Sequence, residues 1–400
     1  MKDKKILISF LGKARDGGEY RSQCYRFDDG QKETSRFFGL TLARREQPDE
    51  FILLGTSSSM WDVLFTDLGN DEKSDHDLTL LIEEVGHNTV GQERLDNLTP
   101  LLEKHLGMSC RPMIIPFGRT TTEQMDILEI LSETVAEGDQ VSMDLTHGFR
   151  HLPMLGFLSA LFLKEVKKAR IEGLYYGAAD MQMDGEAPVV RLDGLLNLAE
   201  WIGAIGRYDQ GGDYGVFAPL LRREQETRSD IALKLEEASF FERINNSSKA
   251  RTILDQFSKN FFQGNDESFS PAARLFRKPL EKRISWWRGK EHGEREGVLA
   301  WHYLRRGDFL RAVIYGYESR VTRWVLKEKL GDPSHFDRRK EAADDLKGRF
   351  KSFDLLSRLR NALAHGIPPT QDEVLTFLSS RVVLERKLRE IFKDLEIREE

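Results

Sequence analysis

Residues 140–150 read Gln-Val-Ser-Met-Asp-Leu-Thr-His-Gly-Phe-Arg, and this stretch decides how the first half of the chain folds. The part from Gln140 to Leu145 is short and rich in apolar residues, as in a strand buried inside a sheet. The polar residues Asp144–Arg150 then lead into Leu152–Val166, an apolar segment long enough for a helix. A buried strand, a polar loop and a helix in this order are typical of a parallel α/β sheet.

The same alternation runs through the first half of the chain. Apolar runs predict further strands at Lys5–Leu11, Phe51–Leu54, Pro112–Phe117 and Arg170–Tyr176. Glu123–Glu137 has the spacing of an amphipathic helix, and the threonines before it are candidates for its cap. Because strands alternate with helices, we expect an α/β domain with a mostly parallel sheet.

The second half has a different character. A glycine-rich stretch, Asp209–Gly215, precedes segments that nearly all have helical periodicity. The clearest predicted helices are Ile231–Phe240, Leu299–Leu304, Phe309–Leu330 and Val374–Phe392. We therefore expect an α/β domain over residues 1–205 and an all-α domain over residues 206–400. Residues 215–295 are interpreted as a connecting or inserted helical region whose role is open.

Composition limits the classes of function. The chain has 400 residues, of which 40% are hydrophobic and 32% charged, as in ordinary globular proteins. A net charge of −6 argues against indiscriminate coating of nucleic acid, although a local basic cleft stays compatible with it. Cys24 and Cys110 are far apart and form no zinc motif. The longest apolar run contains Pro153 and is too short to span a bilayer, so we expect a cytoplasmic protein.

Small and polar residues follow three of the predicted strands. In an open α/β sheet, ligands bind beyond the carboxyl ends of the strands, where these residues would gather. A helix N-terminus after Gly148 would attract phosphate, and Arg150 could pair with an anion. The chain lacks GxGxxG and GxxxxGKS/T motifs, which disfavours dinucleotide binding and NTP hydrolysis. The candidate ligand-binding residues are Ser9, Gly12, Lys13, Thr56, Ser57, Ser58, Ser59, Trp61, Asp144, Thr146, His147, Gly148 and Arg150.

A structural interpretation of the same residues is also open. Asp144 and Thr146 could cap the following helix, and His147 could be a polar residue satisfied at a domain surface. His151 lies one turn further on, but an aspartate with two histidines is weak support for a metal site, and we expect none.

The string Asp144-x-Thr146-His147-Gly148 resembles the DxTHG signature of CRISPR-associated CARF-domain proteins. Ser9–Gly12 and Thr56–Trp61 lie where that family has its ligand loops, and the resemblance covers roughly residues 4–205. It implies a Rossmann-like domain that dimerises and holds a cyclic oligoadenylate across its two-fold axis. Tetra-adenylate is favoured over hexa-adenylate as this activator, and no other cofactor is implied.

A second candidate site lies on the predicted helix Ser352–His365. Leu355, Leu356, Leu359 and Leu363 form one stripe, whereas Asn361 and His365 fall on the opposite arc and Arg360 lies at the border. Gly366 and Pro368-Pro369 would end the helix directly after the histidine. The simpler interpretation is a solvated face, because one arginine–histidine pair at this spacing is expected by chance.

The residue types nevertheless suit RNA cleavage. The 2′-hydroxyl of RNA can attack its own phosphate if one group transfers protons and another stabilises the charged transition state. Histidine titrates near neutral pH and suits the first task, while the permanently charged fork of arginine suits the second. Asn361 could orient either the histidine or the phosphate.

Arg360-Asn-Ala-Leu-Ala-His365 resembles the Rx4–6H motif of HEPN ribonucleases. Together with an upstream DxTHG domain, it resembles the CARF–HEPN ancillary ribonucleases of type III CRISPR systems. The resemblance implies Arg360, Asn361 and His365 as catalytic residues in a site built from two protomers. It also implies single-stranded RNA as substrate, a homodimer or higher oligomer, and metal-independent cleavage to a 2′,3′-cyclic phosphate.

Two other functions stay open. The chain could be a nucleotide-sensing regulator whose helical half binds a partner without cutting RNA. Alternatively, the Asp144–His147 site could itself be a phosphodiesterase that degrades the cyclic oligoadenylate. Lys278–Arg288 and Trp301–Arg306 interleave bases with aromatics, for which helix packing is favoured over RNA contact.

Overall fold

The computed structural model describes residues 3–13, 22–69, 74–224, 229–264, 269–289, 291–365 and 372–399. The chain divides into two units, Met1–Leu196 and Asn197–Glu400, and the division falls within α7 (Asp193–Gly211). The sequence placed this boundary between residues 205 and 206, beside the glycine-rich stretch. The helix continues through that point because Trp201, Ala204 and Tyr208 are buried in the core of the helical unit.

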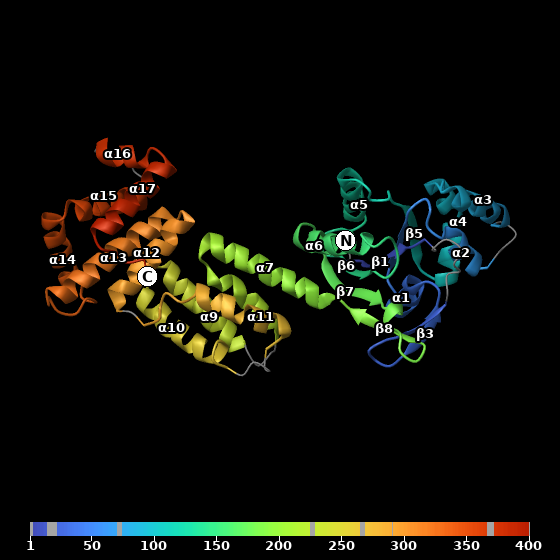
Figure 1. The fold of residues 1–400 in the computed structure, drawn as a ribbon, viewed down its shortest axis with the longest axis horizontal. Coiled ribbons are helices and arrows are strands. Elements are labelled where there is room, and N and C mark those ends of the chain that lie inside the picture. Colours follow the sequence, from blue (N-terminus) through green and yellow to red (C-terminus); the bar gives the residue numbers. More distant parts are fainter. Residues whose placement is uncertain are drawn as a thin grey trace. The chain divides into compact units, whose positions relative to one another are not determined.

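The described strands of the N-terminal unit form one sheet in the order β3-β2-β8-β7-β6-β1-β4-β5 (Figure 1). Their bounds are β1 (Lys5–Leu11), β2 (Gln23–Arg26), β3 (Lys32–Ser35), β4 (Glu50–Gly55), β5 (Ser109–Ile114), β6 (Gln140–Asp144), β7 (Arg170–Gly177) and β8 (Glu186–Arg191). All five predicted strands are present, although β5 begins and ends earlier than expected. The sequence missed β2, β3 and β8, of which β2 and β3 are short and lack an apolar run.

Helices cover both faces of the sheet, because side chains alternate along the central strands. Leu7 and Leu11 of β1 pack with one group of helices, α1 (Phe38–Glu46), α2 (Trp61–Asp67), α3 (Asp75–His87) and α4 (Gln92–Leu106). Ile6, Ile8 and Phe10 face the other group, α5 (Thr121–Glu133) and α6 (Leu152–Glu165). The predicted Rossmann-like α/β architecture is confirmed.

The strand order reverses between β1 and β6. The chain runs outward from β1 to β4 and β5, and then returns to β6 and β7 on the other side of β1. These five strands are parallel, so their carboxyl ends lie at one edge of the sheet. Ser9 of β1 is the register partner of Asp144 of β6, which places both side chains at this point of reversal.

The C-terminal unit is all-helical in its described residues, as predicted. After the short helix η2 (Tyr214–Phe217), it contains α8 (Ala218–Glu224), α9 (Ser229–Arg243), α10 (Ser247–Phe261), α11 (Pro271–Arg283), α12 (His292–Arg306), α13 (Phe309–Lys327), α14 (Phe336–Arg349), α15 (Lys351–His365), α16 (Asp372–Leu378) and α17 (Arg381–Asp394). No described helix is both long enough and apolar enough to cross a membrane.

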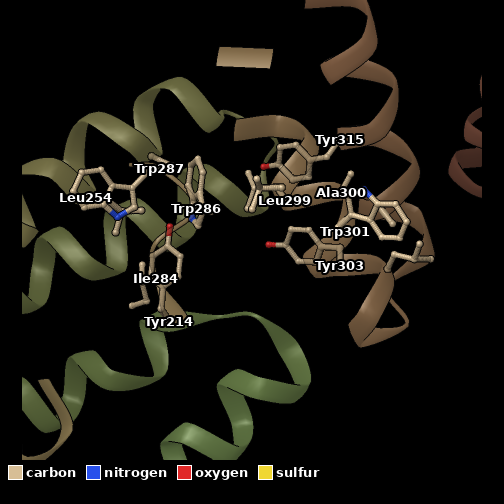
Figure 2. Packing of buried hydrophobic residues seen from close by; sticks show 14 of the residues in the cluster. Tyr214, Leu254, Ile284, Trp286, Trp287, Leu299, Ala300, Trp301, Tyr303 and Tyr315 are labelled. Carbon is tan, nitrogen blue, oxygen red and sulfur yellow. The ribbon is translucent and has the colours of Figure 1, made fainter. Parts of the chain in front are cut away.

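Residues 215–295 contribute to the same core as the rest of the helical unit. Leu254, Ile284 and Trp286 belong to one buried cluster with residues of α12 and α13, and Figure 2 shows part of this packing. Trp287 and Trp301 are also buried, so these aromatics serve packing, as the sequence favoured. The Tyr303 and Tyr315 rings stack with centroids 5.7 Å apart.

Helix ends show where local sequence was informative. α5 begins where predicted, and the Thr120 side chain accepts a hydrogen bond from the Glu123 N–H at 3.2 Å. The predicted single helix Val374–Phe392 is wrong, since α16 and α17 are separate. Ser380 caps α17 by accepting a hydrogen bond from the Val383 N–H, and this cap sets a new helix start inside the apolar pattern.

Candidate functional sites

The first site is built around a buried hydrogen bond where the strand order reverses. The Ser9 hydroxyl donates to Asp144 Oδ2 at 2.6 Å, and both residues are almost fully buried. The start of α1 closes over them: a Cβ added at Gly39 would overlap the Ser9 hydroxyl and lie 3.2 Å from Asp144 Oδ2. Glycine is therefore required here by the close approach of helix and strand ends.

Hydrogen bonds from β7 and from the loop itself fix the DxTHG segment. The Thr146 N–H donates to Asp144 Oδ1 at 2.8 Å, and the Gly177 N–H donates to Thr146 Oγ1 at 2.7 Å. Helix α6 begins only at Leu152, without a side-chain cap. The capping interpretation of Asp144 and Thr146 is therefore wrong, because both side chains hold the loop instead. Gly148, at a φ of 110°, supplies a backbone conformation that residues with a Cβ rarely adopt.

His147 joins the DxTHG loop to the start of α1. Its Nε2 accepts a hydrogen bond from the Phe38 N–H at 3.3 Å. Burial lowers the pKa of His147, against the opposing effect of Asp144, so the neutral ring that can accept this bond is favoured. The void lined by Ser9, Gly39 and His147 measures only about 10 Å³, room for about one water molecule. A nucleotide at this edge must therefore lie over the loops.

The loop after β4 is also held from within. The Ser59 hydroxyl donates to the Leu11 carbonyl at 2.8 Å, and the Trp61 indole N–H donates to the Thr56 carbonyl at 2.9 Å. Thr56, Ser58, Ser59 and Trp61 are buried. Trp61, a candidate ligand-binding residue in the sequence, therefore does not present its ring to a ligand; it packs in the core under the loop.

Of the remaining candidates of this edge, Gly12 is buried and the other three are more accessible. Ser57 is half-buried, whereas Lys13 and Arg150 are exposed. Lys13 Nζ donates to Asn88 Oδ1 at 3.0 Å, and the Gly12 carbonyl accepts from the Met60 N–H. The structure thus brings the three predicted loops to one edge but leaves only part of their residues open to a ligand.

The sequence missed an aromatic group at the same edge. The half-exposed Phe149 ring lies 6.0 Å from Phe117 and stacks on His151 at 6.0 Å between centroids. The Arg119 guanidinium lies 4.2 Å above the Phe117 ring. His151 contacts the Phe117 carbonyl at 2.8 Å, which links the loops after β5 and β6. Within the described residues, no group of three or more His, Cys, Asp and Glu side chains is placed to hold a metal.

The second site is a polar cleft of about 670 Å³ in the helical unit. Arg360, Asn361 and His365 of α15 all line it. The apolar stripe of the same helix is anchored in the core by Leu355, Leu356 and Leu359. The predicted helix stop at Gly366 and Pro368-Pro369 lies outside the described residues.

Arg360 is positioned from α13. Its guanidinium lies 4.7 Å above the ring of Tyr317, which stacks on Phe353 of α15. Burial raises the pKa of Tyr317, although the positive charge of Arg360 acts in the other direction. The side chains of Asn361 and His365 are exposed and make no hydrogen bond with other described residues. Their polar groups are thus available to a molecule that enters the cleft.

Other charged side chains also line this cleft. Sequence reasoning had not selected His292, Glu296 or Arg339 for it. His292 and Glu296 come from α12, and Arg339 of α14 forms an ion pair with Glu318 of α13. The spacing of His292 and Glu296, one helical turn apart, was the available signal. Arg320 of α13 does not line this cleft; it is buried, with its guanidinium 5.0 Å from the Phe350 ring centroid.

The fold and the loops at the strand ends define the N-terminal unit as a Rossmann-like ligand-binding domain. Residues 6–180 match the family described as CRISPR system endoribonuclease Csx1, CARF domain. The N-terminal unit is therefore similar to the CARF domains of this family, and the match supports a CRISPR-associated CARF ancillary protein, as the DxTHG resemblance indicated.

A curated relative agrees with this assignment. The CRISPR-associated protein MJ1674 of Methanocaldococcus jannaschii is 28% identical to this chain over 262 residues. The match covers 59% of this chain and 40% of that protein, so the chain spans well under two thirds of the relative's length. The family match ends at residue 180, before the helical unit begins.

Proposed function

We propose that this protein is an endoribonuclease of type III CRISPR defence that a cyclic oligoadenylate activates through the CARF domain. In this proposal the helical unit is HEPN-like and cuts single-stranded RNA. The observation that carries it is the cleft that Arg360, Asn361 and His365 line together, with the Arg360 guanidinium held over the Tyr317 ring. The family match, whose description names an endoribonuclease, supports the same activity.

The cleft has the groups that cleavage by the RNA 2′-hydroxyl requires. His365 transfers a proton, and Arg360, held against Tyr317, stabilises the extra negative charge on the phosphate. Asn361 orients the phosphate by hydrogen bonding. The reaction needs no metal and leaves a 2′,3′-cyclic phosphate and a 5′-hydroxyl.

Cyclic tetra-adenylate is the activator that we favour. Lys13 and Arg150 supply exposed positive charge for its phosphates, and Ser57 and Phe149 supply a hydroxyl and an aromatic face beside them. The loops that carry these residues are held in place by buried hydrogen bonds, made by Ser9, Asp144, Thr146 and the hydroxyls after β4. Asp144 and His147 are engaged within the fold, which does not favour the alternative phosphodiesterase function for this edge.

A homodimer through α6 would place two copies of these loops together. Met154, Leu158 and Phe162 of α6 and its C-cap residue Val166 recur at one-turn spacing, with exposed fractions of 70%, 53%, 36% and 60%. An exposed apolar stripe of this kind is typical of a protein interface, and one that starts just after the DxTHG loop suits a two-fold contact.

The dimer is tested by Leu158→Glu. We expect the mass measured by light scattering to fall from two chains to one, because the substitution buries a charge in the interface. The circular dichroism spectrum should not change, since Leu158 is already half-exposed within its own chain. A wild-type monomer, or a variant that still dimerises, would contradict this arrangement.

Activation requires that the ligand bind one state of the dimer more tightly than the other. We propose that ligand binding favours the state in which two His365 clefts are correctly opposed. A substitution in the His365 cleft should then abolish RNA cleavage without changing the affinity for the ring.

The test is cleavage of a fluorescent single-stranded RNA in EDTA, with cyclic tetra- and hexa-adenylate supplied separately. We expect cutting with one ring size, loss of cutting in His365→Ala, and unchanged affinity of that variant for the ring by calorimetry. Absence of cutting with every ring would support a regulator without nuclease activity. Chromatography of the recovered ring shows whether the CARF domain degrades it.

A further inference from the structure

The cleft that contains Arg360 and His365 also contains a second histidine. His292 is the first residue of α12, and its side chain is 30% exposed. Its Nε2 lies 3.1 Å from Glu296 Oε1, and 3.2 Å from both Ser247 Oγ and Ser248 Oγ at the start of α10. All four residues line the same cavity as the α15 motif.

Close helix packing fixes this histidine in place. A Cβ added at Gly293 would lie 3.1 Å from the Ser319 carbonyl of α13, so only glycine allows α12 to approach this closely. The Ser319 hydroxyl donates to the Gly293 carbonyl at 2.6 Å. The position of His292 is therefore set by α13 as well as by its own helix.

The partner of His292 is a buried carboxylate. Only 7% of the Glu296 side chain is exposed, and its other oxygen, Oε2, accepts from the Thr322 hydroxyl at 3.0 Å. An ionised carboxylate only accepts hydrogen bonds, so His292 Nε2 carries a proton toward it. In the neutral ring the lone pair is then on Nδ1, which makes no hydrogen bond with the described residues. A histidine held in one tautomer by a buried carboxylate is the arrangement used for proton transfer.

We propose that His292, oriented by Glu296, is a second proton-transfer residue for RNA cleavage, and this inference rests on the proposed function above. One of His292 and His365 accepts the proton of the RNA 2′-hydroxyl as the 2′-oxygen–phosphorus bond forms. The other donates a proton to the 5′-oxygen as the phosphorus–5′-oxygen bond breaks. Each protomer then holds both groups, with Glu296 as a positioning residue.

The test compares His292→Gln and His365→Gln in the full-length protein with the activating ring. Glutamine keeps a hydrogen-bonding group but cannot transfer the proton, so we expect each rate to fall by about 10²- to 10⁴-fold. His302→Gln is the matched control, because His302 lies on the same helix but lines a different cavity. Affinity for an uncleavable 2′-deoxy strand and the unfolding midpoint should stay at their wild-type values.

A substrate with a sulfur leaving group separates the two roles. RNA with a single cleavable linkage, in which sulfur replaces the bridging 5′-oxygen, needs no proton on its leaving group. We therefore expect the rate of one histidine variant to recover to within about tenfold of wild type on this substrate, while the other stays slow.

Glu296→Gln gives an independent measure of positioning. If Glu296 acts through His292, its substitution lowers the rate of the wild-type protein but has little further effect in His292→Gln. A purely structural role predicts additive losses together with a lower unfolding midpoint.

The outcomes distinguish the inference from the proposed function. A wild-type protein that never cuts RNA, or a His365→Gln variant with full activity, overturns the proposed function. If His365→Gln is inactive but His292→Gln cuts at the wild-type rate, only the inference is overturned. The inference is also overturned if the sulfur substrate restores the rate of neither variant or of both. Such a result would fit proton transfer by the His365 residues of two protomers.

Discussion

Asp144 in the CARF domain and His365 in the helical unit are held in opposite ways. Asp144 is buried and accepts hydrogen bonds from Ser9 and from its own loop, which in turn is tied to β7. His365 is exposed at the end of a helix, and its side chain makes no hydrogen bond with another described residue. Asp144 therefore holds the loops of its site in place, while the side chain of His365 is open to a molecule that enters the cleft.

Because of this difference, we expect substitutions in the two regions to change different quantities. Removing a buried, fully paired group leaves other buried groups unsatisfied and costs stability. Removing an exposed group in the cleft changes little in the resting protein, so its effect should appear in catalysis alone. The following predictions use this contrast, from the largest expected effect to the smallest.

The largest effect is expected for Arg360→Lys. Lysine keeps the charge but loses the planar fork and the stacking on Tyr317, so we expect the rate of RNA cleavage to fall by about 10²- to 10³-fold. Unfolding temperature and ring affinity should not change. Arg358→Lys is the control on the same helix, since Arg358 pairs with Asp354 outside the cleft. Equal losses in both variants would show that the helix, and not the cleft, had been disturbed.

A smaller effect is expected at Glu242, a buried carboxylate that contrasts with Asp144. The Tyr303 hydroxyl donates to its Oε1 at 2.6 Å, whereas Oε2 has no hydrogen-bond partner among the described residues. Burial raises the pKa of Glu242 from 4.5 to about 7, despite the opposing hydrogen bond from Tyr303. This rise corresponds to about 3 kcal/mol of stability lost at high pH.

The pH dependence follows from that direction. Below about pH 4.5 the carboxyl is protonated in both the folded and the unfolded state and costs nothing. The cost grows as the pH rises and is complete above about pH 7. Glu242→Gln should therefore stabilise the helical unit at pH 8 but hardly at pH 4.5. Urea unfolding at both values measures this, with the exposed Glu237→Gln on the same helix as control. A gain that is equal at both values would contradict burial of the charge.

Sequence patterns predicted the sheet well because its central strands are continuous apolar runs. The Rossmann-like fold and the loops at the carboxyl ends followed from β1, β4 and β6. The sequence missed strands β2 and β3 because they are short and partly exposed. They join the sheet through the pairing of β2 with β8, which is distant in sequence. The structure divides the chain earlier than the sequence did, within α7, because Trp201 and Tyr208 of that helix already pack in the core of the helical unit.

The sites were predictable only to the level of the motif. Spacing was enough to place Asn361 and His365 on one helix face, with Arg360 at its border. It could not show that His292 and Glu296, which α12 brings from a distant part of the sequence, line the same cleft. Nor could it separate buried Trp61 from exposed Arg150, because burial at a strand end depends on which helix covers the loop.

The smallest effect is expected for Gly39→Ala, which tests the close packing at the CARF site. The added methyl group would overlap the Ser9 hydroxyl, so either α1 shifts or the Ser9–Asp144 hydrogen bond breaks. Overpacking of this kind costs about 1–3 kcal/mol, measured by urea unfolding of the CARF domain, and ring affinity should fall with it. Gly86→Ala in α3 is the control, because nothing lies within 4 Å of its added Cβ. There the substitution should stabilise by about 0.5–1 kcal/mol through helix propensity. If both variants gain stability, the start of α1 is not packed against Ser9, and Asp144 is not closed off by that helix as the contrast with His365 requires.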